Sequence, residues 1–388
     1  MNEPVYLDHN ATTPVAAPVV EAMLDCLRHV SGNPSSAHQP GRRAAALVAE
    51  SRDSVAALIG AQAAEIIFTG CATEANNLAL LGVAAARPGR RHLIISAVEH
   101  PAVLEPARQL ERQGWALTVV PVDSSGRVAP AEVAAALRPD TALVSIMHAN
   151  NEVGTLQPIA AIAAVTRAHG VLLHTDAAQS AGKIPVDVAA LGVDLLTIAG
   201  HKFCAPKGIG ALYVRTGTPL AAILHGAGQE RGLRPGTENV PAIAGLGAAA
   251  RLARERLPEA GRSLREPRDR LHRLLAAEIP GLALNGHPGE RLPNTLHVSF
   301  PGVTGRELLE AVSADVAAAV GSACHSGQDT VSGVLAAMGC DAARARGAVR
   351  LSTGWDTTGP DIERAAQALI AAWQKACRPP AAAGHPAD

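Results

Sequence analysis

The chain has 388 residues, of which 48% are hydrophobic and 18% charged, and its formal net charge is −1 at pH 7. This composition is typical of a globular protein with a large core, and it excludes a broad basic surface for nucleic acid. No apolar run reaches the roughly 18 residues that would span a bilayer, so we expect neither a membrane nor a nucleic-acid partner.

The six cysteines are scattered without a Cys-x-x-Cys pair, and the fifteen histidines form no His-x-x-x-His pair. These spacings argue against a disulfide framework and a metal site, and they fit reduced thiols in a cytosol. The N-terminus also lacks the charged-then-apolar pattern of a secretory signal. We therefore expect a cytoplasmic protein that binds no metal.

The first half of the chain alternates short apolar runs with helical patterns. Helices are expected over residues 18–30, 42–59, 103–113, 131–137 and 159–169, and strands begin near residues 66, 92, 116, 141 and 171. Such alternation is typical of a doubly wound α/β sheet with mainly parallel strands.

The stretch EIIFTGCATEANN contains a strand, a tight turn and the start of a helix. The strand covers residues 66–68, the turn covers 69–72, and the helix is expected from Thr73, with Glu74 in its first turn. Free amides and the helix dipole at such a start favour an anion, and Thr73 adds a hydroxyl donor. The alternative is an ordinary turn in which Thr73 is the N-cap.

Lys202 follows the apolar run at residues 195–198, and a second strand is expected over residues 209–214. A lysine held against apolar walls loses solvation, so its pKa falls and its amine can attack a carbonyl. The alternative is a solvated surface lysine, which is the usual state of this residue type.

Polar residues gather at the carboxyl ends of the expected strands, where ligands bind in such sheets. A phosphate cradle, a carboxylate, a histidine ring and a lysine amine are together what pyridoxal 5′-phosphate (PLP) requires. The residues concerned are Thr73, His100, Asn151, Asp176, Gln179, His201 and Lys202.

The second half of the chain begins with a glycine-rich loop at residues 224–240, whose length indicates a functional or interface role. A helix over 242–257 and a charged helical segment to residue 273 follow, and strands are expected near 294–300, 316–320 and 349–354. The predicted division is a large domain at 15–260, a small domain at 1–14 and 261–378, and a disordered tail at 379–388.

Several long motifs resemble the cysteine desulfurase and selenocysteine lyase family, a NifS/IscS-type branch of the class-V aminotransferases. The motifs are YLDHNATTP, GNPSS, ATEANN, VEHPAV, MHANNEVG, HTDAAQSAGK, GHKFCAPKGIGALY, QERGLRPGTENVPAIAGLG and VGSACHS. The resemblance implies the fold type I of PLP-dependent transferases. Its large domain has a mainly parallel mixed sheet between helices, and its smaller domain is also α/β.

The resemblance also implies roles for individual residues. Lys202 would form the Schiff base and move the Cα proton, while His100 would stack on the ring and act as acid or base. Phosphate contacts would come from Thr73, His201 and the Ala72 amide, and from Thr237 of the other subunit of a homodimer. Ring contacts would come from Asn151, Asp176 and Gln179, and substrate-carboxylate contacts from Arg350 and Asn33.

Cys324 is the predicted acceptor of the substrate sulfur. The resemblance implies that PLP-dependent conversion of L-cysteine to L-alanine leaves a persulfide on Cys324. The sulfur would then pass to an acceptor protein, either an iron–sulfur scaffold or a thiolation carrier. The alternatives are a selenocysteine lyase that releases selenide, and an inactive sulfur-transfer scaffold. Cys71 stands in the phosphate turn, where the family usually has serine-glycine, and no role is predicted for it.

Overall fold

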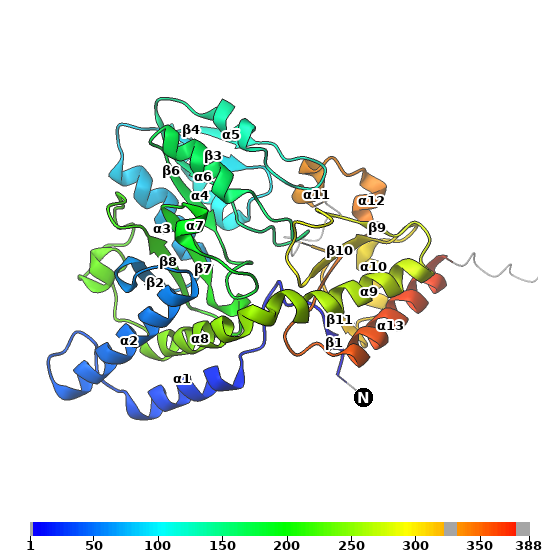
Figure 1. Ribbon diagram of the computed structural model, residues 1–388, viewed down its shortest axis with the longest axis horizontal. Coiled ribbons are helices and arrows are strands. Elements are labelled where there is room, and N and C mark those ends of the chain that lie inside the picture. The colour runs from blue at the N-terminus through cyan, green and yellow to red at the C-terminus, as the bar shows by residue number, and fades with distance from the viewer. Residues whose placement is uncertain (1–2, 322–331, 378–388) are drawn as a thin grey trace, which may run out of the picture.

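A computed structural model describes residues 3–321 and 332–377. The described chain forms two lobes, each built around its own sheet (Figure 1). Cys324 and the predicted tail lie outside the described residues. Within the described ranges, no helix has both the length and the apolar character needed to cross a membrane.

The larger lobe contains a seven-stranded sheet with the strand order β2-β8-β7-β6-β5-β3-β4. The strands in this order are β2 (Ile66–Thr69), β8 (Gly210–Val214), β7 (Leu195–Ala199), β6 (Leu172–Asp176), β5 (Thr141–Ser145), β3 (His92–Ser96) and β4 (Ala116–Val120). Strand β8 runs opposite to the other six strands, because a short connection returns the chain from β7 directly alongside it. The predicted mainly parallel mixed sheet is therefore confirmed.

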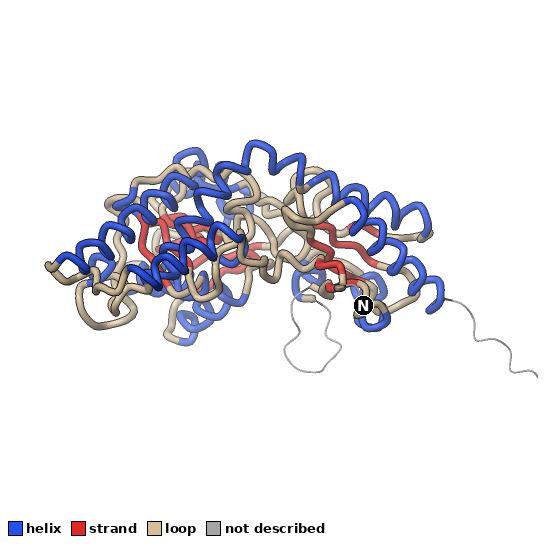
Figure 2. Tube along the Cα trace, turned by 90° about the horizontal axis from the view of Figure 1, so that it is seen from below, coloured by secondary structure: helices blue, strands red, loops and turns tan. Residues whose placement is uncertain are grey.

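Helices cover both faces of this sheet, as the tube in Figure 2 shows. They are α1 (Ala17–His29), α2 (Gln39–Leu58), α3 (Ala72–Ala86), α4 (Pro101–Arg112), α5 (Pro130–Ala136), α6 (Ile159–Ala168), α7 (Val188–Leu191) and α8 (Val240–Ser263). Neighbouring strand residues point to opposite cores: Ile94 packs into one, and Leu93 and Ile95 into the other. A sheet buried on both faces explains why its strands read as short continuous apolar runs.

The smaller lobe combines two small sheets with two long helices and three short ones. Its three-stranded sheet has the order β12-β10-β9, and a separate parallel pair joins β1 to β11. The strands are β1 (Val5–Tyr6), β9 (Ala283–Leu284), β10 (Thr295–Ser299), β11 (Val316–Ala317) and β12 (Ala348–Ser352), and the helices are α9 (Arg265–Glu278), α10 (Gly305–Ala311), α11 (Gly333–Ala337), α12 (Ala342–Arg346) and α13 (Gly359–Cys377).

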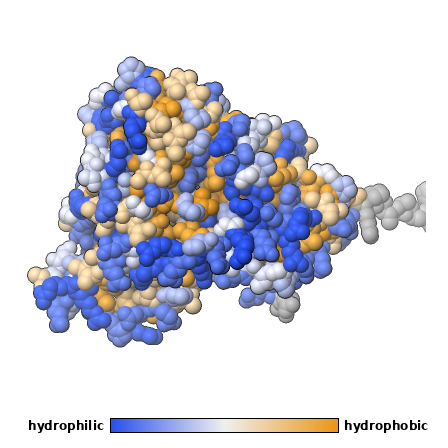
Figure 3. Space-filling view, in the orientation of Figure 1, coloured by the Kyte–Doolittle hydropathy of each residue, from blue (hydrophilic) through white to orange (hydrophobic). Residues whose placement is uncertain are grey.

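Several predicted boundaries are wrong by a few residues. The helix expected over residues 42–59 begins at Gln39, because Pro40 is tolerated in the first turn of a helix, and the strand expected near 316–320 ends at Ala317. Helix α8 continues past Pro258 to Ser263, and the charged segment belongs partly to α8 and partly to α9. Hydrophilic residues dominate the surface over α8 and α9 (Figure 3). The predicted domain division at residue 261 falls inside α8 and stays a prediction.

Candidate active site

The start of α3 forms an uncapped helix N-terminus directly after β2. The helix begins one residue earlier than predicted, so Cys71 is the N-cap, and its side chain makes no capping hydrogen bond. The alternative in which Thr73 caps the helix is therefore wrong. Glu74 turns away to accept a hydrogen bond from the Gly70 amide at 2.7 Å, and it pairs with Arg234. The first-turn amides therefore have no side-chain cap, and Thr73 beside them is exposed, which leaves this helix start available to an anion.

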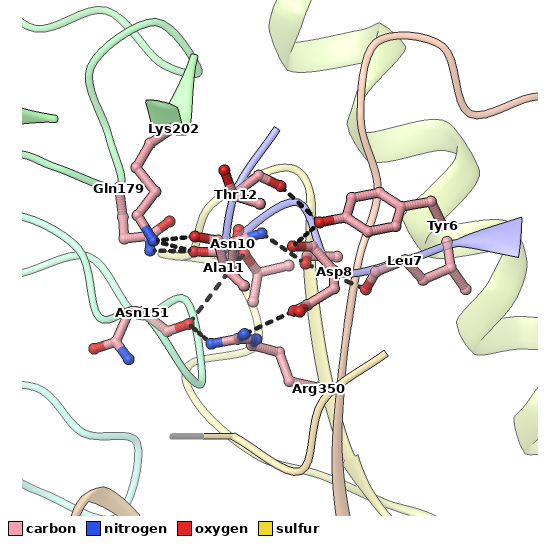
Figure 4. A network of polar contacts seen from close by, with 12 residues as sticks. Tyr6, Leu7, Asp8, Asn10, Ala11, Thr12, Asn151, Gln179, Lys202 and Arg350 are labelled. Atoms are coloured by element: carbon pink, nitrogen blue, oxygen red, sulfur yellow. Dashed lines mark hydrogen bonds and ion pairs between the residues drawn. The ribbon is translucent and has the colours of Figure 1, made fainter. Parts of the chain in front are cut away.

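Lys202 ends the 3₁₀ helix η2 (Gly200–Lys202), which follows β7 at the edge of the sheet. Its Nζ donates hydrogen bonds to the backbone carbonyls of Asn10 at 2.6 Å and Ala11 at 2.8 Å (Figure 4). Burial and the nearby Arg350 guanidinium lower the pKa of Lys202 to about 8. The alternative of a solvated surface lysine is therefore wrong, because this amine is held inside the protein.

Asp176 is the last residue of β6, and its carboxylate is held from two sides. The Asn76 amide donates to Oδ2 at 2.7 Å, and the backbone N–H of Ala178 donates to Oδ1 at 2.8 Å. Asn76 lies on α3, so the carboxylate is tied to the helix that starts at the predicted cradle. Sequence reasoning missed Asn76, although it lies in the quoted motif ATEANN.

His100 is the N-cap of α4 and accepts a hydrogen bond from the Ala102 amide through Nδ1 at 3.1 Å. Burial lowers its pKa; the Asp176 carboxylate opposes this shift and the Lys202 ammonium adds to it. These couplings bring His100, Asp176 and Lys202 into one electrostatic group. Because Nδ1 accepts, the neutral ring carries its proton on Nε2.

Glu99 holds the turn that presents His100. Its Oε1 accepts hydrogen bonds from the Ser96 hydroxyl at 2.5 Å and the Met147 amide at 2.9 Å, joining the ends of β3 and β5. Burial raises the pKa of Glu99 to about 8, so the side chain is mostly protonated at neutral pH. The sequence pattern did not single out Glu99, because one acidic residue beside a histidine is a weak signal.

The N-terminal segment crosses the junction of the two lobes and joins the site to both of them (Figure 4). The buried side chain of Asn10 donates to Thr295 at 2.9 Å and to the Asn151 carbonyl at 3.3 Å, while its backbone N–H donates to Ser352 at 2.9 Å. His201, on η2, contacts the same segment, with Nδ1 at 3.1 Å from the Thr12 hydroxyl. Sequence reasoning assigned no role to residues 8–13, because an extended turn-rich segment has no periodic signal.

Arg350 reaches the site from β12 of the smaller lobe. Its Nη2 pairs with Asp8 at 2.8 Å, its Nη1 donates to the Asn151 carbonyl at 3.0 Å, and its Nε has no hydrogen-bond partner among the described residues. The side chain is only 5% exposed. A buried guanidinium beside a single carboxylate retains donor capacity for a carboxylate ligand.

Of three further predicted residues, two lie in loops and one falls outside the described residues. The Asn33 side chain accepts from the Ser35 amide at 2.9 Å in the loop after α1. Thr237 is exposed in the loop before α8, and Cys324 lies outside the described residues. The other predicted residues lie at the ends of the central strands, at the start of α3 or on β12. They are Ala72, Thr73, His100, Asn151, Asp176, Gln179, His201, Lys202 and Arg350.

These residues fit PLP. An uncapped helix start suits a phosphate, a carboxylate fixed by two donors suits a protonated pyridine nitrogen, and a buried amine with a lowered pKa suits an aldehyde carbon. This donor set is the one that a lysine-dependent PLP enzyme requires. The family model for class-V aminotransferases matches residues 5–365, and enzymes of this family depend on PLP.

Similar proteins identify the branch. The chain is 44% identical over 376 residues to "Cysteine desulfurase IscS" of Methanosarcina thermophila, an alignment that covers 96% of this chain and 93% of the relative. A solved "NifS-like protein" is 38% identical with a TM-score of 0.90, covering 96% and 100% of the two chains. The solved structure described as SspA in complex with cysteine is also 38% identical, with a TM-score of 0.81 and coverage of 90% and 98%. The chain belongs to the cysteine desulfurase family of the class-V aminotransferases.

Proposed function

We propose that this protein is a PLP-dependent cysteine desulfurase that converts L-cysteine to L-alanine and transfers the sulfur to Cys324. The observation that carries the proposal is the buried Lys202 amine, grouped with Asp176 and His100 and coupled to Arg350 from the other lobe. The names of the relatives, and the neighbouring structure in complex with cysteine, favour cysteine over selenocysteine.

The site residues are proposed to have separate roles in holding the cofactor and moving a proton. When bound, PLP acts as an electron sink for the substrate carbon, which labilises the Cα proton and weakens the bond from Cβ to sulfur. Asp176 would hold the pyridine nitrogen, and the α3 amides with Thr73 and His201 would hold the phosphate. Lys202 would anchor the cofactor and move the proton at Cα.

Arg350 orients the substrate in this proposal. Its guanidinium already lies between the Asp8 carboxylate and the Asn151 carbonyl, and a planar fork of donors matches the substrate carboxylate. Asn33 would assist at the same carboxylate. Asp8 fixes the direction of Arg350, which places the α-carboxylate end of the substrate toward the smaller lobe.

Cys324 is the sulfur acceptor in this proposal. Its thiolate attacks the substrate sulfur, the bond from sulfur to Cβ breaks, and the electron pair of that bond remains with the carbon skeleton. Protonation of this carbon completes L-alanine, and Cys324 becomes a persulfide. An acceptor protein, such as an iron–sulfur scaffold or a thiolation carrier, would then take the terminal sulfur by attack of its own thiolate.

We also propose a cytoplasmic homodimer in which Thr237 reaches the phosphate of the other subunit. The support is the position of the loop that carries this exposed residue. Arg234 pairs with Glu74 at 2.8 Å, and the Glu230 carboxylate bonds to Arg52 at 2.6 Å and to the Phe68 amide at 2.9 Å. The loop is thus fastened beside the phosphate cradle, with Thr237 left free to contact a partner.

The purified protein with PLP should show a visible absorbance band, and it should release alanine and sulfide in equal amounts from cysteine in the presence of a thiol reductant. The same assay with selenocysteine gives the matched comparison. Turnover of selenocysteine alone would support the lyase alternative. A protein that stays colourless with PLP and turns over neither substrate would contradict the proposal. It would support the remaining alternative, an inactive sulfur-transfer scaffold.

The lowered pKa of Lys202 predicts how PLP uptake by the apoprotein depends on pH. Only the neutral amine attacks the aldehyde, and a pKa of about 8 makes its fraction roughly one tenth at pH 7 and nine tenths at pH 9. The uptake rate, followed by absorbance at constant PLP, should therefore rise through pH 8 and level off above pH 9. A rate that keeps rising beyond pH 10 would indicate a lysine of ordinary pKa.

A further inference from the structure

A second buried lysine, Lys183, lies beside the site and has no part in the proposed reaction. It is 4% exposed, and its Nζ donates to Gln179 Oε1 at 3.0 Å and to Asn10 Oδ1 at 3.1 Å. Both partners are neutral amide oxygens, and no ion pair involves Lys183 in the part of the chain that the structure describes.

Burying this amine is costly. Burial, with the charges of Lys202 and Arg350, lowers the pKa of Lys183 well below its ordinary value. An apolar side chain of similar length would fill the same space without the desolvation cost. The feature that an apolar residue cannot replace is the pair of N–H donors, which a lysine amine has even when it is neutral.

Those donors decide which way the Gln179 amide faces. An amide side chain has a carbonyl oxygen on one side and an NH₂ group on the other, and only the oxygen can accept from Lys183. The Gln179 NH₂ therefore faces away from Lys183 and donates to the Asn10 carbonyl at 2.9 Å. The same carbonyl accepts from Lys202 Nζ at 2.6 Å, so the Gln179 donor lies beside the amine that would carry the cofactor.

Asn10 is oriented in the same way. Its side-chain oxygen accepts from Lys183 and, at 3.0 Å, from Asn294. Its NH₂ group is thereby directed to Thr295 and to the Asn151 carbonyl. Lys183 thus fixes which way the oxygen and the NH₂ group point in two buried side-chain amides that contact the site, those of Gln179 and Asn10.

We propose that Lys183 is a positioning residue, which turns the Gln179 amide so that its NH₂ group faces the cofactor ring oxygen. The inference rests on the proposed function, because it requires PLP at Lys202. A phenolic ring oxygen carries negative charge and requires a donor, whereas an amide oxygen in the same place would repel it.

The test compares PLP binding and the visible spectrum of the bound cofactor at one fixed pH. Lys183→Met should weaken PLP binding about tenfold, which corresponds to one hydrogen bond to a charged group, and should change the ratio of the absorbance bands. Lys375→Met, which removes an exposed lysine on α13, should behave like the parent protein.

A double-mutant cycle separates positioning from a general structural effect. In a Gln179→Ala background, Lys183→Met should cause no further change in binding or spectrum, because the oriented amide is already gone. An equal effect in both backgrounds, or parent-like spectra for Lys183→Met, would overturn the proposal. If Lys183→Met does not fold, Lys183→Leu, which likewise lacks an N–H donor, provides the same cycle. A parent protein that does not bind PLP would instead contradict the proposed function.

Discussion

Replacing Lys202 with alanine is expected to reduce alanine formation from cysteine on the order of a thousandfold or more. The ε-amine is proposed both to anchor PLP and to carry the Cα proton, so one substitution removes two roles. Its buried position, with hydrogen bonds to the Asn10 and Ala11 carbonyls, leaves no other lysine at the same place. The measurement is the initial rate of alanine release, together with the absorbance of the protein after PLP is added and excess cofactor removed.

The nearest buried amine provides an internal check on this result. Lys183 Nζ lies 3.1 Å from Asn10 Oδ1, yet it is held by amide oxygens and is not expected to substitute for Lys202. The Lys202→Ala protein should therefore bind PLP without the band of a Schiff base, while exposed Lys375→Ala should retain both band and activity. A Lys202→Ala protein with the parent rate would exclude Lys202 as the catalytic amine.

Replacing Cys324 with serine is expected to abolish the transfer of sulfur, with a loss on the order of a thousandfold, while leaving the PLP band in place. A serine hydroxyl is not ionised at neutral pH, and it is a far poorer nucleophile toward sulfur than a thiolate. The measurement is mass spectrometry of the protein after cysteine treatment. The parent protein should gain one sulfur atom on Cys324, and the variant should gain none.

The described residues on either side of the segment that contains Cys324 lie close to the site. Gly321 lies against Glu152, and Ser332 donates to the Glu152 carboxylate at 2.5 Å, next to the Asn151 carbonyl that binds Arg350. Both described residues that flank the segment are thus anchored near the predicted substrate carboxylate.

The control for Cys324 is Cys377→Ser, which changes an exposed thiol at the end of α13. It should keep the parent rate and the added sulfur on Cys324. If Cys324→Ser still released sulfide at the parent rate, or if the added sulfur were found on another cysteine, the persulfide assignment would be wrong.

Local patterns in the sequence predicted most of the sheet and most of the candidate site. The runs near residues 66, 92, 141 and 172 form strands because burial on both faces of a sheet selects continuous apolar segments. The boundaries were less accurate, since a strand ends where the sheet edge ends, which the local residues do not encode. Cys71 at the N-cap and the continuation of α8 through Pro258 show the same limit.

By itself, the sequence determined the α/β class, the family, and the lysine at the end of β7, because these depend on local periodicity and on contiguous motifs. Only the tertiary structure decided what surrounds that lysine. Asp8 meets Arg350 across 342 positions, Asn10 meets Lys202 across 192, and Lys183 meets Asn10 across 173. Hydrogen bonds between such distant residues depend on how the two lobes pack around the N-terminal segment, and packing of this kind leaves no periodic signal along the chain.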